Sequence, residues 1–257
     1  MAAGKDGGSR GRARSVEMLW GGERERPSRG PKPGLSTARI VEVAIEVADR
    51  EGLPAVSMQR IASEFGFTTM SLYRYLPGKA QLIDFMIDAA IDVSPSLDDV
   101  ADDWRPKLEE WARRLRGVYH RHPWMFELAA PGPMGPNQLS WLEAAVDSLS
   151  GTGLTGAEKL DAVFALTGLI RSWIYRSVSK EEEQQPITSD MAEQWGSDVG
   201  DLVRTHHDRY PALLAAMSSG AFDPAEGDGE EFGLRCVLDG IGVLIKERAA
   251  AAAEANA

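Results

Sequence analysis

The residues with the most distinctive chemistry lie between Thr68 and Tyr75. If this stretch forms a helix, Leu72 and either Tyr75 or Leu76 fall on one face and can pack inward. The other face then combines hydroxyls, a thioether, a phenol and a guanidinium, from Thr69, Met70, Ser71, Tyr73 and Arg74. Hydroxyls and phenols can bind phosphates, an arginine can bind guanine, and a methionine can contact thymine methyl groups. This face therefore predicts contact with DNA.

The flanking residues predict the helices that hold this face in position. Before Gly66, apolar residues recur at helical spacing: Met58, Ile61, Ala62 and Phe65. Gly66 can adopt the left-handed conformation that ends a helix, and Thr68 offers a hydroxyl as the N-cap of the next one. Pro77-Gly78 ends that second helix, and a third begins at Lys79 with its own apolar stripe: Leu82, Ile83, Met86 and Ala90. Two short helices joined by a tight glycine turn form a helix-turn-helix, whose second helix enters the major groove of DNA.

The stretch from Leu35 to Ile91 resembles the N-terminal domain of the tetracycline-repressor (TetR) family. The chain matches the family's pattern, in register, at Ser57-Met58, Ile61-Ala62, Gly66-Phe67-Thr68, Leu72-Tyr73, Tyr75-Leu76 and Lys79. The resemblance implies that one set of side chains faces DNA: Thr69, Ser71, Tyr73, Arg74, Tyr75 and Lys79. It also implies that Ser57, Gln59 and Arg60 contact phosphates, and Thr68 and Met70 complete the predicted DNA-binding set. The alternative is that this unit is a plain core element without a role in DNA binding.

The net charge of −11 is unevenly distributed along the chain. Residues 1–36 carry eight Lys/Arg and four Asp/Glu, a net +4, and residues 52–80 carry a net +2. Residues 93–257 carry 15 Lys/Arg and 27 Asp/Glu, a net −12. The acidic residues thus lie away from the predicted DNA-binding stretch, and they repel DNA from the rest of the protein. This distribution favours one docking orientation on DNA.

Residues 1–34 are basic, rich in Gly and Pro, and without helical period, which predicts a disordered arm. Four of its cations lie in the last part, residues 24–33. Such an arm could lie in the minor groove beside the predicted recognition helix. A solvated tail that adds only nonspecific positive charge is the alternative.

The remainder of the chain completes the prediction of an all-α protein. The helix-turn-helix DNA-binding domain, residues 35–94, begins with a helix capped by Ser36 and ends before Pro95. A larger helical domain, residues 95–257, follows, with helices predicted at 104–120, 124–130, 138–149, 157–178 and 230–247. It resembles the TetR-like C-terminal domain at Asp103–Arg105, Arg121–Trp124, Gly135–Asn137 and Phe232–Gly240. The resemblance implies a ligand pocket and a dimer interface in this domain.

A homodimer is predicted to form through helices 157–178 and 230–247. The first carries apolar residues almost all round, more than one packing face requires. The second carries three small residues suited to close helix approach: Gly233, Gly240 and Gly242. A two-turn recognition helix contacts few base pairs, so a dimer on a palindromic operator in double-stranded DNA would increase discrimination. The alternative is that both helices are central core helices of one chain.

A pocket for a small hydrophobic effector is predicted in the second domain, which holds six of the seven tryptophans. Its candidate lining is Trp111, Leu115, Trp124, Met125, Met134, Asn137, Phe164, Thr167 and Arg171. Arg171 among apolar neighbours needs an anion, either a ligand carboxylate or an internal acid such as Glu127. The tetracycline repressor binds its drug–magnesium chelate through a histidine, and Ala129 stands at that position here. This difference argues against tetracycline–magnesium as the effector.

Other functional classes lack their motifs in this sequence. The four histidines have spacings unsuited to shared metal ligation, and there is no phosphate-binding glycine loop, zinc motif or nucleophile elbow. We therefore expect neither an enzyme nor a bound metal or cofactor. The single cysteine, Cys236, is predicted to be a buried packing residue, and the absence of a second cysteine predicts a reduced, cytoplasmic protein. No apolar run is long enough to cross a membrane.

Together these features predict a homodimeric DNA-binding regulator, most simply a repressor that responds to a ligand. A ligand in the second domain would change the spacing of the two recognition helices. An activator, or a module that binds a protein partner through the same dimer, is the alternative. An affinity for DNA that falls as the salt concentration rises would distinguish a DNA-binding regulator from a module that binds a protein partner.

Overall fold

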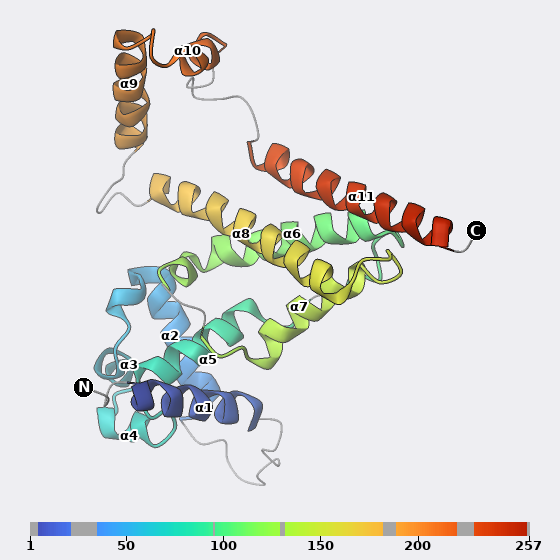
Figure 1. The fold of residues 1–257 in the computed structure, drawn as a ribbon. Coiled ribbons are helices and arrows are strands. Elements are labelled where there is room, and N and C mark those ends of the chain that lie inside the picture. The colour runs from blue at the N-terminus through green and yellow to red at the C-terminus, as the bar shows by residue number, and fades with distance from the viewer. Residues whose placement is uncertain are drawn as a thin grey trace. The chain divides into compact units, whose positions relative to one another are not determined.

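The structure, a computed structural model, describes residues 5–21, 35–94, 96–128, 132–181, 189–219 and 229–255. The regular elements in these ranges are all helices, as predicted, and no strand occurs among them (Figure 1). None of the described helices combines the length and the apolar character that a membrane span requires. The chain divides into two compact units, residues 1–163 and 164–257.

Four helices of the first unit form the predicted helix-turn-helix domain: α2 (Thr37–Glu51), α3 (Met58–Glu64), α4 (Thr69–Tyr73) and α5 (Lys79–Ile91). A 3-10 turn, η2 (Leu53–Ala55), joins α2 to α3. Ser36 caps α2 as predicted, because its Oγ accepts a hydrogen bond of 3.2 Å from the amide of Arg39. The core between these helices contains fully buried aliphatic side chains: Ile40, Ile61, Leu72, Leu76, Leu82 and Met86. Each such side chain contributes about 1.5–3 kcal/mol on burial, so this core holds α4 firmly on its neighbours.

The structure places a helix, α1 (Lys5–Gly21), in the segment predicted to be a disordered arm. This helix packs beside α5 (Figure 1). Leu19 is buried, and the indole N–H of Trp20 donates to the carbonyl of Met134 over 3.1 Å. The guanidinium of Arg12 donates to the carbonyl of Gly132 over 3.3 Å. The sequence shows no helical period here, so the helix depends on partners 114 and 120 positions away in the chain.

The first unit also contains α6 (Trp104–Arg121), η3 (Pro123–Phe126) and α7 (Pro136–Ser148). Helix α5 contacts both α6 and α7. The indole of Trp141 donates to the carbonyls of Ile91 and Asp92, over 3.2 and 3.1 Å, at the end of α5. The indole of Trp111 donates in turn to the carbonyl of Trp141 over 2.9 Å. These indoles bind the end of α5 to the helices that follow, within one compact unit, and the domain boundary at residue 94 stays a prediction.

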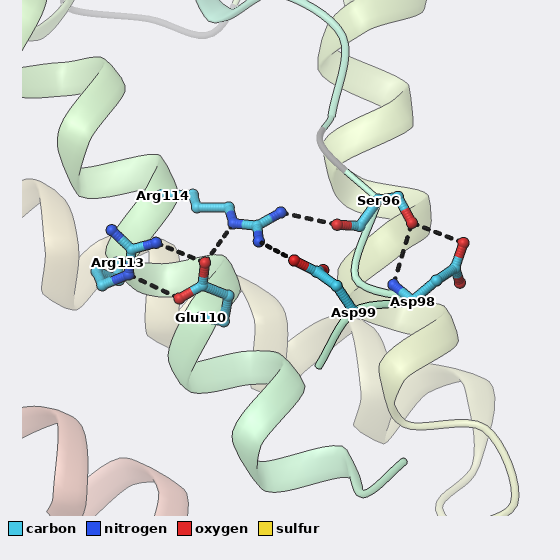
Figure 2. A network of polar contacts seen from close by, with 6 residues as sticks. All are labelled: Ser96, Asp98, Asp99, Glu110, Arg113 and Arg114. Carbon is cyan, nitrogen blue, oxygen red and sulfur yellow. Dashed lines mark hydrogen bonds and ion pairs between the residues drawn. The ribbon is translucent and has the colours of Figure 1, made fainter. Parts of the chain in front are cut away.

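A polar network fixes the segment that precedes α6 (Figure 2). The Glu110 carboxylate accepts hydrogen bonds of 2.5–2.6 Å from both Arg113 and Arg114. Arg114 also donates to the carbonyl of Ser96 over 2.7 Å and lies 3.6 Å from the Asp99 carboxylate. The bonds from Arg113, and then those from Arg114, lower the pKa of Glu110 from 4.5 to about 2, against the effect of desolvation.

The second unit contains most of α8 (Gly156–Glu181), and α9 (Ser189–Thr205), α10 (Pro211–Ser218) and α11 (Gly229–Ala255). The predicted helices 157–178 and 230–247 lie inside α8 and α11. A Cβ at Gly233 would stand 3.2 Å from Leu169 and 3.4 Å from Trp173, so the small residue permits this close approach of α11 to α8. Cys236 is exposed, and its predicted burial is wrong, because the described part of the chain does not cover the face of α11 that carries it.

Candidate nucleic-acid interface

The turn between α3 and α4 sets the direction of α4, the predicted recognition helix. Gly66 has φ of 67°, the left-handed conformation that its position predicts. Its amide donates to the carbonyl of Ser63 over 3.1 Å, and the amide of Phe67 donates to the carbonyl of Ala62 over 3.0 Å. These bonds satisfy carbonyls that the end of α3 leaves without helical partners. A side chain at position 66 would strain this conformation, so the sharp turn depends on glycine.

Helix α4 is shorter than the predicted helix, with five residues from Thr69 to Tyr73. Leu72 accounts for the shortening, because its carbonyl accepts from the amides of both Tyr75 and Leu76, over 2.9 and 3.0 Å. Thr68 has the extended backbone of an N-cap, as predicted, but its side chain makes no capping bond. Its Oγ1 lies 3.2 Å from the Ser71 Oγ instead. The two hydroxyls therefore form one polar pair on the outer surface.

The outward face of α4 carries the side chains that the sequence analysis assigned to it. Met70 is 73% exposed and Tyr73 is 44% exposed, although both are large and apolar in part. Thr69 and Ser71 are half-buried beside them. Exposed large side chains on a helix anchored by a buried leucine are suited to a partner surface.

Arg74 and Lys79 are exposed, and neither forms an ion pair within the part of the chain that the structure describes. Lys79 is the first residue of α5, whose first turn contains no acidic residue. The amides at this helix start have no helical acceptors and favour an anion. The unpaired cations and the helix start together form a surface that can bind phosphates and base edges.

The three residues predicted to contact phosphates at the start of α3 differ in their availability. The Ser57 Oγ accepts from the amide of Arg60 over 3.0 Å and so caps α3, and Gln59 is exposed. The Arg60 guanidinium is paired with Glu51, over 2.9 Å, and with Glu64. These two carboxylates raise the pKa of Arg60 and offset its positive charge. Arg60 is therefore a weaker candidate for phosphate contact than Arg74 or Lys79.

Sequence analysis missed Asp49, which fixes the end of α2. Its Oδ1 accepts a hydrogen bond of 2.7 Å from the indole Nε1 of Trp124 and lies 2.8 Å from the Nδ1 of His122. The two donors belong to the turn after α6 and to η3, so this carboxylate joins the end of α2 to these later elements. The sequence feature that could have indicated this contact was Trp124, since a buried indole N–H requires a hydrogen-bond acceptor.

Asp88 on α5 is the second acidic residue that sequence analysis missed. It is only 6% exposed, and its Oδ1 accepts from the amide of Gln138, at the start of α7, over 3.0 Å. Its backbone carbonyl accepts from the side-chain amide of Asn137 over 2.9 Å. Desolvation raises the pKa of the Asp88 carboxyl, while the amides of Gln138 and Asn137 act in the opposite direction. The sequence feature that could have indicated its burial was the position of Asp88 within the apolar stripe of α5.

The predicted effector-pocket residues fall in both units. In the first unit Trp111, Leu115, Trp124 and Met125 are buried, Met134 is 41% exposed and Asn137 is half-buried. Both buried indoles find acceptors inside the protein, in Trp141 and Asp49. In the second unit Phe164 is 58% exposed, Thr167 is half-buried and Arg171 is exposed. Within the described residues Arg171 is not enclosed by apolar neighbours. The pocket itself stays a prediction.

Helices α8 and α11 expose large apolar side chains in the second unit. Phe164 on α8 is 58% exposed, and Phe232, Val243 and Leu244 on α11 are 60%, 54% and 42% exposed. The Arg235 guanidinium lies 5.8 Å from the centre of the Phe232 ring. Several exposed apolar residues on two helices that approach each other closely are a feature of interaction surfaces.

Known proteins resemble this chain in sequence and in fold. The sequence profile described as "Bacterial regulatory proteins, tetR family" matches residues 40–85, and that of "Tetracyclin repressor-like, C-terminal domain" matches residues 95–245. The HTH-type transcriptional repressor DrrR1 of Streptomyces coeruleorubidus is 40% identical over 243 residues, which cover 92% of this chain and 87% of that protein. An HTH-type transcriptional regulator of Saccharopolyspora erythraea is 30% identical, over 76% of this chain and 78% of its own. The structure of ActR from Streptomyces coelicolor, in complex with (S)-DNPA, has a TM-score of 0.67 at 23% identity, over 82% of this chain and 97% of ActR.

Proposed function

The chain belongs to the tetR family of bacterial regulatory proteins, and from this premise we propose that it is a repressor which a small hydrophobic effector releases from a palindromic operator. It is a DNA-binding transcriptional regulator and not an enzyme. The observation that carries the proposal is the exposed surface formed by Met70, Tyr73, Arg74 and Lys79. As a regulator that binds the chromosome, it would act in the bacterial cytoplasm.

The DNA-binding surface combines positioning contacts with base recognition. Lys79 and the amides at the start of α5 would bind one backbone phosphate, and the Tyr73 hydroxyl a second. The Arg74 guanidinium can make a bidentate contact with guanine, which discriminates by about 1–3 kcal/mol against other bases. The methyl group of Met70 would contact a thymine methyl. Thr68, Thr69, Ser71 and Tyr75 would complete the contacts of the helix.

A homodimer would place two such surfaces on one operator. The exposed apolar side chains of α8 and α11 support an interface built from these helices and their copies in a second chain. A twofold-symmetric dimer recognises a palindrome, with half-sites about one helical turn of DNA, or a multiple of it, apart. Two recognition helices multiply the discrimination that one short helix achieves.

The response to an effector is supported by the match of residues 95–245 to a tetracyclin repressor-like C-terminal domain. ActR, which shares the fold of this chain, holds the small molecule (S)-DNPA in its solved structure. An effector would act here by binding more tightly to the form of the dimer whose recognition helices no longer match the half-sites. A ligand that bound both forms equally would not release the protein from DNA.

Footprinting on the DNA directly upstream of the protein's own gene tests the proposal. We expect protection of a palindrome in moderate salt with excess competitor DNA, and loss of the footprint in Tyr73→Ala and Lys79→Ala. Arg204→Ala, which removes an exposed arginine of α9 far along the sequence from the recognition helix, is the control that should retain it. If the protein binds neither this DNA nor any fragment of a genomic library, the result would instead support the alternative function, a module that binds protein partners.

A further inference from the structure

A cavity of about 820 Å³ lies in the first unit, between α1, α2 and α5. Its walls are largely apolar, formed by Met18, Leu19, Val41, Ile45, Phe85 and Ala89. Arg74 and Tyr75, which follow directly after α4, also line it. The volume falls within the range of roughly 300–1,000 Å³ that small-molecule sites occupy.

Helix α1 closes one side of this cavity. The helix is held by the hydrogen bonds of Trp20 to Met134 and of Arg12 to Gly132, and by the buried side chain of Leu19. Its residues lie outside the ranges 40–85 and 95–245 that match the family profiles. The cavity therefore depends on an element that those profiles do not include. Of the residues predicted to line the effector pocket, its lining includes Asn137 alone.

The charges that line the cavity are predominantly negative. Glu42, Glu46 and Asp88 contribute carboxylates, and Arg74 is the one cation among the lining residues. Glu42 pairs with Arg39 over 2.7 Å, and Asp88 accepts the amide of Gln138. Glu46 is exposed and forms no salt bridge within the described residues. Arg39 interacts with it electrostatically but is paired with Glu42, so the Glu46 carboxylate is available to a bound cation.

We propose that this cavity binds a lipophilic organic cation, whose apolar body packs against Met18, Ile45 and Phe85 and whose charge lies near Glu46. The apolar walls stabilise the body of such a molecule by removing its surface from water. The Glu46 carboxylate at the edge compensates the partial desolvation of the bound cation's charge. The same carboxylate disfavours an anion of the same shape. If Arg74 and Tyr75 contact DNA, as the proposed function holds, the bound cation competes with DNA for these side chains.

Isothermal titration calorimetry of the full chain, without DNA, tests the site with two probes of equal shape and opposite charge. We expect saturable binding of tetraphenylphosphonium, one ion per chain, and binding of tetraphenylborate that is weaker by about tenfold or more. Ala89→Phe on α5 and Ala38→Phe on α2 replace exposed alanines that line the cavity, and each should weaken phosphonium binding about tenfold by filling it. Ala80→Phe places the same ring on the exposed surface of α5 outside the cavity and should leave binding unchanged. Glu46→Gln should reduce the preference for phosphonium over borate.

Equal affinities for the two ions, or phosphonium binding that both cavity-filling variants retain, would overturn the proposal. Far-UV circular dichroism confirms that each variant is folded before the titration. Because the titration contains no DNA, its result does not depend on whether the protein is a repressor. Competition between the cation and DNA is measured separately, as the Kd for a footprinted DNA fragment with and without tetraphenylphosphonium. The ion should raise this Kd in the wild type and not in Ala89→Phe. An equal increase in both proteins would contradict the competition for Arg74 and Tyr75.

Discussion

Trp124 and Asp49 are joined by a hydrogen bond of 2.7 Å between the indole Nε1 and the carboxylate Oδ1, although 75 positions separate them in the chain. Trp124 is only 2% exposed, so water cannot replace this acceptor. The same oxygen lies 2.8 Å from the Nδ1 of His122. One carboxylate therefore holds the end of α2, and with it the helix-turn-helix, against η3.

Asp49→Ala should lower the free energy of unfolding by about 1–3 kcal/mol, because it leaves the buried indole N–H of Trp124 without an acceptor. Asp49→Asn keeps a side-chain oxygen at this position and should lose less. Urea denaturation followed by circular dichroism measures both. Asp201→Ala, at an exposed carboxylate of α9, is the control and should stay within about 0.5 kcal/mol of the wild type. Equal losses in the two Asp49 variants would contradict the acceptor role.

Gly135→Ala should destabilise the protein by about 1–3 kcal/mol, the usual cost of overpacking. A Cβ at this position would overlap the carboxylate of Asp88, which the amide of Gln138 holds in place. Gly156→Ala is the matched control, because a Cβ there meets no atom within 4 Å. The control should be neutral or slightly more stable, since alanine restricts the unfolded chain more than glycine does. Thermal melting distinguishes the two variants, and similar melting temperatures would rule out the close contact at Gly135.

The pKa of Glu110, lowered to about 2 by Arg113 and Arg114, predicts a specific loss of stability in acid. A carboxyl whose pKa is lower in the folded state stabilises the fold above its ordinary pKa of 4.5 and loses that contribution as the pH falls toward 2. Glu110→Gln should reduce stability by about 1 kcal/mol at neutral pH, the upper range for an ion pair near the surface, since the Glu110 and Arg114 side chains are each still 20% exposed. The difference between variant and wild type should shrink below pH 4.5, as urea denaturation at several pH values will measure. A difference that stays constant down to pH 2 would exclude the ionised pair as its cause.

The helix-turn-helix could be predicted from the sequence because its determinants are local. The left-handed Gly66, the cap at Ser36 and the buried Leu72 each act within a few residues, and the structure has all three. Helix lengths were less predictable: α4 ends at Tyr73 because two amides share the carbonyl of Leu72.

Contacts between distant residues could not be predicted in this way. Helix α1 has no amphipathic period, and it is held through Trp20 and Arg12 by carbonyls in the loop before α7. The cavity beside it exists only when α1, α2 and α5 are brought together. Asp49 likewise looks like an ordinary surface acid until its partner Trp124 in η3 is known.

Arg74→Ala and Arg60→Ala should differ in their effect on DNA binding, although both remove an arginine from the helix-turn-helix. Arg74 has no ion pair in the described residues, so its loss should weaken binding about tenfold or more and change the preferred sequence. Arg60 is paired with Glu51 and Glu64, so its loss should change the affinity less. Lys79→Ala should reduce the slope of log K against log salt by about 1, because one phosphate contact is lost. Fluorescence anisotropy with a footprinted fragment measures all three, and an Arg60 effect as large as that of Arg74 would contradict this assignment.

Val243→Asp should convert the dimer to a monomer at micromolar concentration if α11 forms the interface between two chains. Val243 is 54% exposed in the single chain, and a carboxylate there would be desolvated between two copies of α11. Leu202→Asp on α9 is the matched control, because Leu202 is 59% exposed but lies outside the predicted interface helices. Light scattering coupled to size-exclusion chromatography gives the mass of each variant. A monomeric Leu202→Asp together with a dimeric Val243→Asp would move the interface to α9. If both variants remain dimeric, the contact does not depend on either position, and the pairing of α8 and α11 across two chains would have to be abandoned.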